Sequence, residues 1–309
     1  MIDQVESEHE PVLVSELVSA IGASRGGEFL DCTYGAGGHS RAILAAHPAA
    51  KVFAIDRDLR VIERVRTKIK ATGSDTRLSV QHGNFAELQA LVGGRQFNGV
   101  IADLGLSTMQ LREARGFSFS DDVSLDMRMD ESQERDANYF VNQVSERELC
   151  RVLQRGGVGA DSKRLARVIV AKRPVSTAKE LASIVAQAQR RDKVEGAHPA
   201  TVVFQALRIA VNEELDSIEQ FLSNVVDVLL PGGRLAVICF HSLEDKIVTS
   251  RMRDWATGCT CPASRPCECG LDKLGTLLTK KAITPGCEEV QRNPASRSAR
   301  LRVFEFSPN

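Results

Sequence analysis

The first hundred residues alternate short apolar runs with amphipathic stretches, and this alternation constrains the fold more than any other feature. It is typical of βαβ units, in which helices cover a parallel sheet. Four strands are predicted, at residues 28–31, 51–56, 78–82 and 97–103. Each ends at a polar or acidic residue, so these side chains should gather at the carboxyl edge of the sheet, where open α/β sheets bind ligands.

The alternation is interrupted and later resumes. Residues 40–46 and 59–71 are predicted crossover helices, whereas about 111–200 shows only polar loop and helical patterns near 137–154, 161–172 and 177–190. An amphipathic helix at 212–230, ended by Pro231-Gly232-Gly233, then leads to a buried strand at 234–240, and 300–306 reads as an added edge strand. With 309 residues, we predict an α/β, Rossmann-like doubly wound domain (1–110 and 205–309) with a mostly helical insertion (111–204).

A glycine-rich turn, residues 31–40 (DCTYGAGGHS), lies between the first strand and the first helix. A backbone that turns tightly there and presents N–H groups to a ligand needs glycine. A dinucleotide fingerprint would place a third glycine at Ser40, and a phosphate-binding Walker loop would continue with Gly-Lys-Ser/Thr. Both of those patterns fail.

Other residues at the same edge suggest a nucleoside ligand. Asp56 ends the second strand, where a carboxylate can accept hydrogen bonds from ribose hydroxyls, Phe85 could face an adenine ring, and Asp103 closes the fourth strand. This combination resembles class I S-adenosylmethionine (SAM) methyltransferases. A dehydrogenase, or a sheet whose glycines only turn the chain, remains the alternative at this point.

Motifs along nearly the whole chain resemble the RsmH (MraW) family. They are HEPVL (9–13), GAGGHS (35–40), DLG (103–105), RGFSF (115–119), LDMRMD (125–130), HPAT (198–201), FQALRI (204–209), PGGR (231–234), FHSLED (240–245), NP (293–294) and RSARLR (297–302). The resemblance implies a SAM-dependent enzyme that methylates N4 of a cytosine in the decoding region of 16S ribosomal RNA. It places SAM against Gly37, Gly38, His39, Asp56, Phe85, Asp103 and Gln110.

Two segments depart from the family pattern. Gly156-Gly-Val-Gly159 stands where the family usually has Tyr-Gly-Glu-Glu, which puts contacts of the inserted domain in doubt. Leu106-Ser-Thr-Met-Gln110 replaces the commoner Val-Ser-Ser-Pro-Gln but keeps Gln110.

The chemistry needs an acceptor for the cytosine amine, whose lone pair is otherwise delocalised into the ring. Asp103 is the candidate catalytic acceptor, with a purely cofactor-holding carboxylate as the alternative. No aromatic residue directly follows it, so Phe117, Phe119 or His241 would have to supply a stacking platform. His39 is expected to position the cofactor. For His241 we expect a hydrogen bond to the substrate, the alternative for this segment being a helix cap by Ser242.

Lysine and arginine together number 40, as do aspartate and glutamate, so an RNA partner would be held by local patches and not by a global field. Two patches are candidates: Lys163, Arg164, Arg167, Lys172 and Arg173, and then Arg292, Arg297, Arg300 and Arg302. Basic side chains neutralise phosphates without reading sequence. The alternatives are a solvated helix face for the first patch and carboxylate pairs that fix the last strand for the second.

Four of the eight cysteines crowd into Cys259, Cys261, Cys267 and Cys269. Four thiolates suit tetrahedral zinc, although structural sites usually space each pair by two or more residues. A reduced surface loop is the alternative to a metal site.

No secretory signal or membrane-spanning run is recognised, so a cytoplasmic protein without a membrane partner is expected. Expected partners are small-subunit ribosomal RNA or the 30S particle, with a possible homodimer. The competing functions are a same-fold methyltransferase acting on another amine, such as a DNA base, and an inactive RNA-binding assembly factor.

Overall fold

The computed structural model describes residues 11–72, 76–106, 115–118, 122–188, 200–259, 261, 264, 266 and 268–308. The chain divides into two compact units. The sheet unit comprises Met1–Gly105 and Asp216–Asn309, and the helical unit comprises Leu106–Leu215. Within the described ranges, no helix combines the length and the apolar character that crossing a bilayer requires.

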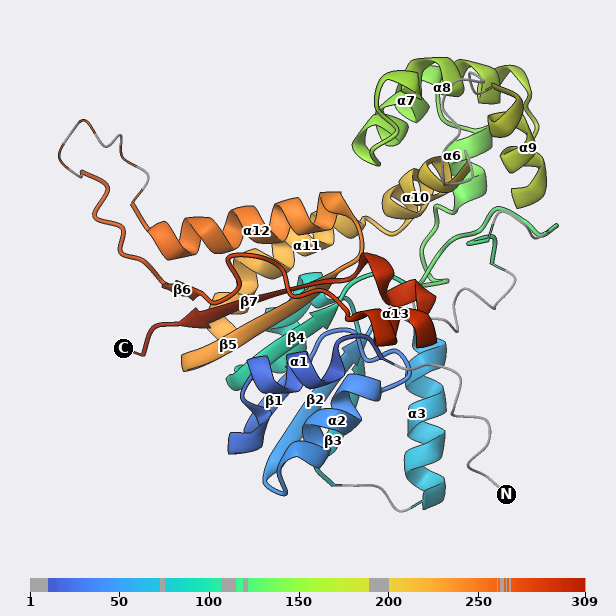
Figure 1. Cartoon of the computed structure of the whole chain (residues 1–309). Helices are drawn as coiled ribbons and strands as arrows, with labels where there is room; N and C mark the ends of the chain where they lie inside the picture. The colour runs from blue at the N-terminus through green and yellow to red at the C-terminus, as the bar shows by residue number, and fades with distance from the viewer. Residues whose placement is uncertain are drawn as a thin grey trace. The chain divides into compact units, whose positions relative to one another are not determined.

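The sheet unit is built on one seven-stranded sheet with the order β3-β2-β1-β4-β5-β7-β6 (Figure 1). Its strands are β1 (Gly27–Asp31), β2 (Ala50–Asp56), β3 (Leu78–His82), β4 (Phe97–Asp103), β5 (Leu229–Cys239), β6 (Gly275–Leu277) and β7 (Arg300–Phe306). The first five run parallel, whereas β7 is antiparallel to both β5 and β6. The predicted α/β, Rossmann-like class is confirmed.

Helices cover the sheet on both faces, because successive residues of each strand point to opposite sides. Leu30 and Val100 belong to one apolar cluster, and their neighbours Phe29 and Ile101 belong to the other. The helices of this unit are α1 (Val14–Ala20), α2 (Gly38–Ala46), α3 (Leu59–Thr72), α4 (Leu88–Val92), α11 (Glu214–Asn224, which begins in the helical unit), α12 (Ser242–Thr257) and α13 (Cys287–Arg292). Short 3-10 turns are η1 (Ala23–Arg25), η2 (Phe85–Glu87), η4 (Val225–Val228) and η5 (Pro294–Ser298).

The helical unit has its own apolar core, which includes Leu149, Leu165, Leu181 and Leu207. Its elements are α6 (Ala137–Asn142), α7 (Glu146–Arg155), η3 (Gly159–Asp161), α8 (Ser162–Ala171), α9 (Ala178–Ala188) and α10 (Ala200–Val211). Polar side chains begin three of them: the Asp136 carboxylate accepts from Tyr139 N at 2.8 Å, Ser145 Oγ accepts from Glu148 N at 3.2 Å, and Thr177 Oγ1 accepts from Glu180 N at 3.2 Å.

Gly156 explains part of the departure at residues 156–159. A Cβ atom at this position would collide with the backbone of Ala206 in α10. The glycine therefore lets α7 and α10 approach closely, which a tyrosine at the same position would prevent.

Two predictions about the second half of the sheet were wrong. The helix expected at 212–230 is α-helical only to Asn224 and continues as the η4 turn to Val228. Pro231-Gly232-Gly233 does not end it but lies inside β5, where the β4–β5 register shifts between Phe97 and Gly99. Gly232 accommodates this irregular start with φ of +75°. The strand 300–306 is not at the edge, because β6 pairs with its outer side.

Candidate active site

The turn between β1 and α2 needs its glycines for steric reasons. Gly37 has φ of +76° at the N-terminus of α2, and a Cβ there would strike the Tyr34 side chain. A Cβ on Gly38 would come within 2.5 Å of the Pro11 ring. Larger residues at these positions would displace the turn.

Asp56 ties this turn to the end of β2. Its carboxylate accepts from Gly35 N at 2.7 Å and from Asp58 N at 2.8 Å. Only 8% of Asp56 is exposed, and burial raises the pKa of its carboxyl to about 6 despite these two hydrogen bonds. Each carboxylate oxygen can accept more than one hydrogen bond, so the group retains acceptor capacity for a ligand.

Asp31, at the end of β1, is a further acid at this edge that is not among the predicted site residues. It is 2% exposed and accepts hydrogen bonds from Ser40 Oγ at 2.6 Å and Thr33 N at 3.1 Å. Burial raises the pKa of Asp31 as well. Its position matches those of Asp56 and Asp103, each the last residue of a parallel strand, and this was the signal that could have found it.

Asp103 and His39 face each other beside these two acids. His39 Nε2 lies 2.8 Å from the carbonyl oxygen of Val12, which can only accept, so Nε2 carries the proton and Nδ1 is directed toward Asp103 Oδ2 at 3.7 Å. The backbone N–H of Asp103 donates to Thr33 Oγ1 at 2.7 Å. These contacts fix the histidine ring and the end of β4 with respect to each other.

The Asp103 carboxylate is incompletely satisfied. Its Oδ1 atom is buried and has no hydrogen-bond partner in the part of the chain that the structure describes. Burial raises the pKa of Asp103 to about 6; the nearby His39 opposes this effect, whereas the charges of Asp31 and Glu244 add to it. A buried acceptor without a donor, in a cluster of carboxylates, is typical of a functional site.

Phe85 follows β3 and begins η2. The Asn84 side chain caps this turn by accepting from Ala86 N at 3.0 Å. The Phe85 ring packs edge to face against Phe221, with centroids 5.4 Å apart, and stays partly exposed. The packing fixes the ring and leaves part of it available for contact with a flat ligand.

The residue that caps α12 is His241. The alternative for this segment, a cap by Ser242, is therefore wrong. Its Nδ1 accepts from Glu244 N at 3.3 Å, while Glu244 Oε2 accepts from Phe240 N and His241 N at 2.8 and 3.2 Å. Nε2 of the ring also lies 3.1 Å from Glu244 Oε1, and only 12% of the His241 side chain is exposed. The geometry therefore does not support the expected contact between His241 and RNA.

The predicted arginine patch is divided by its contacts. Arg302 is 9% exposed, and its guanidinium forms a two-point ion pair with Asp245, at 2.7 and 3.0 Å. Arg300 Nη1 lies 3.6 Å from the same carboxylate. Arg292, Arg297 and Arg300 are all exposed. This pairing favours the alternative weighed for the patch, in which a carboxylate pair fixes the last strand, because a buried and paired guanidinium is poorly available to phosphate.

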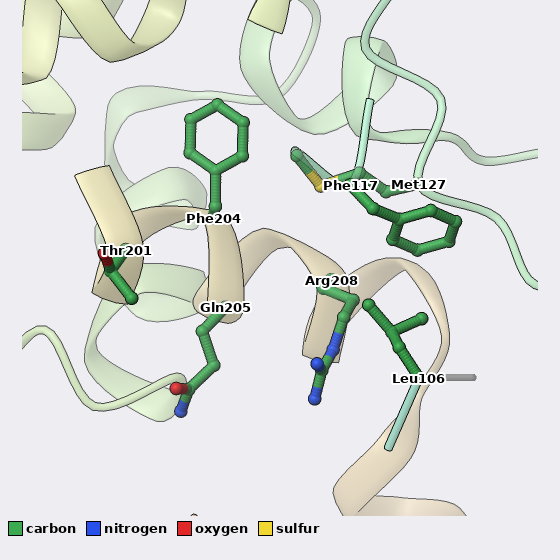
Figure 2. Close-up of a pocket in the computed structure, with 7 residues that line it drawn as sticks. All are labelled: Leu106, Phe117, Met127, Thr201, Phe204, Gln205 and Arg208. Carbon is green, nitrogen blue, oxygen red and sulfur yellow. The ribbon is translucent and has the colours of Figure 1, made fainter. Parts of the chain in front are cut away.

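The helical unit contains a pocket with one polar side (Figure 2). Its polar lining includes Arg208, whose guanidinium is held by Glu214 through two contacts of 2.8 Å. Phe117, one candidate for a stacking platform, also lines this pocket and is 8% exposed. The lining residues are Leu106, Phe117, Met127, Thr201, Phe204, Gln205 and Arg208.

Three of the four predicted metal ligands lie together. The Sγ atoms of Cys259, Cys261 and Cys269 are all within 4.8 Å of one another. The other predicted ligand, Cys267, lies outside the described residues, as do Gln110 and Phe119.

Comparison with known proteins identifies relatives over nearly the whole chain. The model of the MraW methylase family matches residues 6–307. "Ribosomal RNA small subunit methyltransferase H" of Thermomicrobium roseum is 44% identical, with 98% of this chain and 95% of that protein covered. The protein of the same name from Geobacter sp. (strain M21) is 45% identical, with 96% and 98% covered. A solved rRNA methylase from Streptococcus thermophilus aligns at 11% identity over 95% and 93% of the two chains, with a TM-score of 0.39.

Proposed function

The chain belongs to the MraW methylase family, and we propose on this basis that it is a SAM-dependent enzyme that methylates N4 of a cytosine in the decoding region of 16S ribosomal RNA. The names of relatives at 44–45% identity supply the ribosomal substrate. The observation in this chain that carries the proposal is the Oδ1 atom of Asp103, buried without a donor at the end of β4. An amine substrate brings the N–H group that this oxygen lacks.

The residues at the carboxyl edge fit SAM. The Asp56 carboxylate is suited to the ribose hydroxyls, Gly37 and Gly38 keep side chains away from the turn, and Phe85 offers a partly exposed ring to adenine. When bound, SAM supplies a methyl group on a positively charged sulfur. His39 is assigned to positioning, because the Val12 carbonyl fixes its ring beside Asp103.

Asp103 is proposed to prepare the nucleophile. By accepting an N4–H, Oδ1 would turn the amine so that its lone pair points at the methyl group, a geometry that mainly favours the transition state. Transfer forms the N4–CH3 bond, breaks the S–CH3 bond and releases one proton from N4. A carboxyl with a pKa of about 6, next to the Nδ1 of His39, is suited to hold that proton.

RNA contacts are proposed for the exposed Arg292 and Arg297, with Arg300 beside them. Exposed arginines can reach phosphates, whereas the pairing of Arg302 removes it from this set. We further propose that the RNA is presented in the 30S particle and that the enzyme works in the cytoplasm, where ribosomal RNA is found. The homodimer stays a prediction, which light scattering on the purified chain tests.

The decisive experiment supplies the purified chain and SAM with 16S RNA, free or in 30S particles, from cells that lack the corresponding gene. Nucleoside mass spectrometry should detect N4-methylcytidine. Asp103→Asn should abolish the signal, and the matched exposed acid variant Asp227→Asn should preserve it. Methylation of a different atom, or of DNA and not RNA, would overturn the proposal.

A further inference from the structure

The cysteine loop between α12 and β6 has no part in the chemistry proposed above, but it has the donor set of a metal site. Cys259, Cys261 and Cys269 place their Sγ atoms within 4.8 Å of one another. Thiolates around a tetrahedral zinc ion, with Zn–S bonds of about 2.3 Å, lie roughly 3.8 Å apart. The three sulfurs therefore reach zinc-binding distances with small side-chain adjustments.

A backbone contact supports metal binding by the first of these sulfurs. The N–H of Cys261 donates to Cys259 Sγ at 3.4 Å. Such a donor stabilises negative charge on sulfur, and the thiolate is the form that binds metal. The other described cysteines, such as the exposed Cys287 of α13, lie outside this three-sulfur cluster.

The loop is closed at its base. Gly258 has φ of +67°, and a Cβ there would collide with the backbone of Asp272 and Lys273. Leu274 N donates to Trp255 O at 2.8 Å, so the returning chain is bonded to the end of α12. Cys259 thus follows the point where the two ends of the loop meet.

Apolar packing contributes little to this loop. Leu271 is 57% exposed and Leu274 is 40% exposed. No apolar side chain is buried among the residues of this loop that the structure describes (258, 259, 261, 264, 266 and 268–274). Such a segment must gain its order from other contacts, and small loops commonly gain it from a metal.

We propose that Cys259, Cys261 and Cys269 bind a structural zinc ion that fixes the loop between α12 and β6. A fourth ligand would close the tetrahedron. Cys267, which the sequence analysis names as a ligand, lies outside the described residues, and the proposal rests on the three described thiolates.

The position in the fold makes the ion structural and not catalytic. α12 begins just after the carboxyl end of β5, and Glu244 lies in its first turn. The 16 residues of the helix extend about 24 Å at 1.5 Å per residue. β6 begins away from the carboxyl end of β5, because Gly275 pairs with Phe306 and the neighbouring Glu305 pairs with Arg234 in the middle of β5. Cys259 therefore follows the end of α12 that lies away from the carboxyl end of β5 (Figure 1).

Metal analysis of the full-length protein tests the proposal. The chain is purified under reducing conditions without a metal-affinity tag, and zinc is measured by mass spectrometry for wild type, Cys259→Ser, Cys261→Ser and Cys269→Ser. Cys287→Ser serves as the matched control, since it removes an exposed thiol outside the cluster. We expect about one zinc per chain in wild type and the control, and at least a fivefold loss in each cluster variant.

Reconstitution keeps the test valid if a variant folds poorly. Wild type stripped by a chelator should take up one equivalent of zinc, or of cobalt with visible thiolate absorption, and its melting temperature should return to that of the untreated protein. The proposal is overturned if stripped and reduced wild type binds neither metal, if the cluster variants retain zinc, or if iron or a disulfide occupies the cysteines.

Discussion

Replacing Asp103 by asparagine tests the proposed acceptor, because the change removes the charge and keeps the shape. Burial raises the pKa of Asp103 from 3.8 to about 6. The folded state therefore holds this proton more tightly than the unfolded state, so unfolding free energy is lost as pH rises from about 4 to about 6. A shift of about 2 units corresponds to about 3 kcal/mol at neutral pH.

The variant should therefore be more stable than wild type at pH 7.5. The Asp103 side chain is 24% exposed, so water screens part of the effect, and we expect a gain of about 1–3 kcal/mol in unfolding free energy. Urea titrations at pH 7.5 and pH 5 measure it, and the difference between the proteins should shrink at the lower pH. Asp227→Asn, at an exposed position, should show neither the gain nor its pH dependence.

Turnover should change in the opposite direction. Loss of an acceptor that acts in the transition state should lower turnover by about 100-fold or more, with a much smaller change in SAM affinity. Wild-type turnover should itself fall as pH drops below about 6, where Asp103 gains a proton. Equal losses of turnover and SAM affinity, or an active variant that is no more stable at pH 7.5, would refute the reasoning.

Three further predictions concern the ribose acceptor, the glycine turn and the arginine patch. Asp56→Asn should weaken SAM binding by roughly 10- to 100-fold in calorimetry, because a charged acceptor is lost; unchanged affinity would place the ribose elsewhere. Gly37→Ala should lower the unfolding free energy by about 1–3 kcal/mol more than Gly94→Ala, which has a similar positive φ and open space around it, so equal losses would exclude the Tyr34 collision. Arg302→Ala should lower the melting temperature and leave the salt dependence of RNA binding unchanged. Arg297→Ala should reduce the slope of log K against log salt by about 0.7–0.9 and leave the melting temperature unchanged. The reverse pattern would contradict both assignments.

The parallel strands could be predicted from the sequence because apolar runs and their polar ends are local features. Residues 78–82, 97–103 and 300–306 are strands with the predicted bounds. β6 was missed because Gly275–Leu277 is too short to show a period, and it forms a strand by pairing with β7. The end of α11 depends on where β5 begins to pair with β4, and the local sequence pattern does not reveal this long-range pairing.

The candidate site was predictable to a similar extent. Acids at the ends of strands selected Asp56 and Asp103, and the same rule applied to Asp31 would have found the third buried carboxylate. The His241 cap was missed because serine is the commoner cap and stands next to it. Arg302 pairs with Asp245 because β7 packs next to α12, and neither segment's sequence predicts that contact.

The β4–β5 pairing has a consequence for the order of folding. Phe97 pairs with Leu229, roughly 130 residues later in the chain, and the whole helical unit lies between them. The helical unit is continuous and its core is internal, so its contacts close shorter loops and should form first. In pulsed hydrogen exchange during refolding, amides of α7 and α10 should gain protection before those of β5. The insertion would then act as an early folding nucleus that shortens the effective chain between the two halves of the sheet.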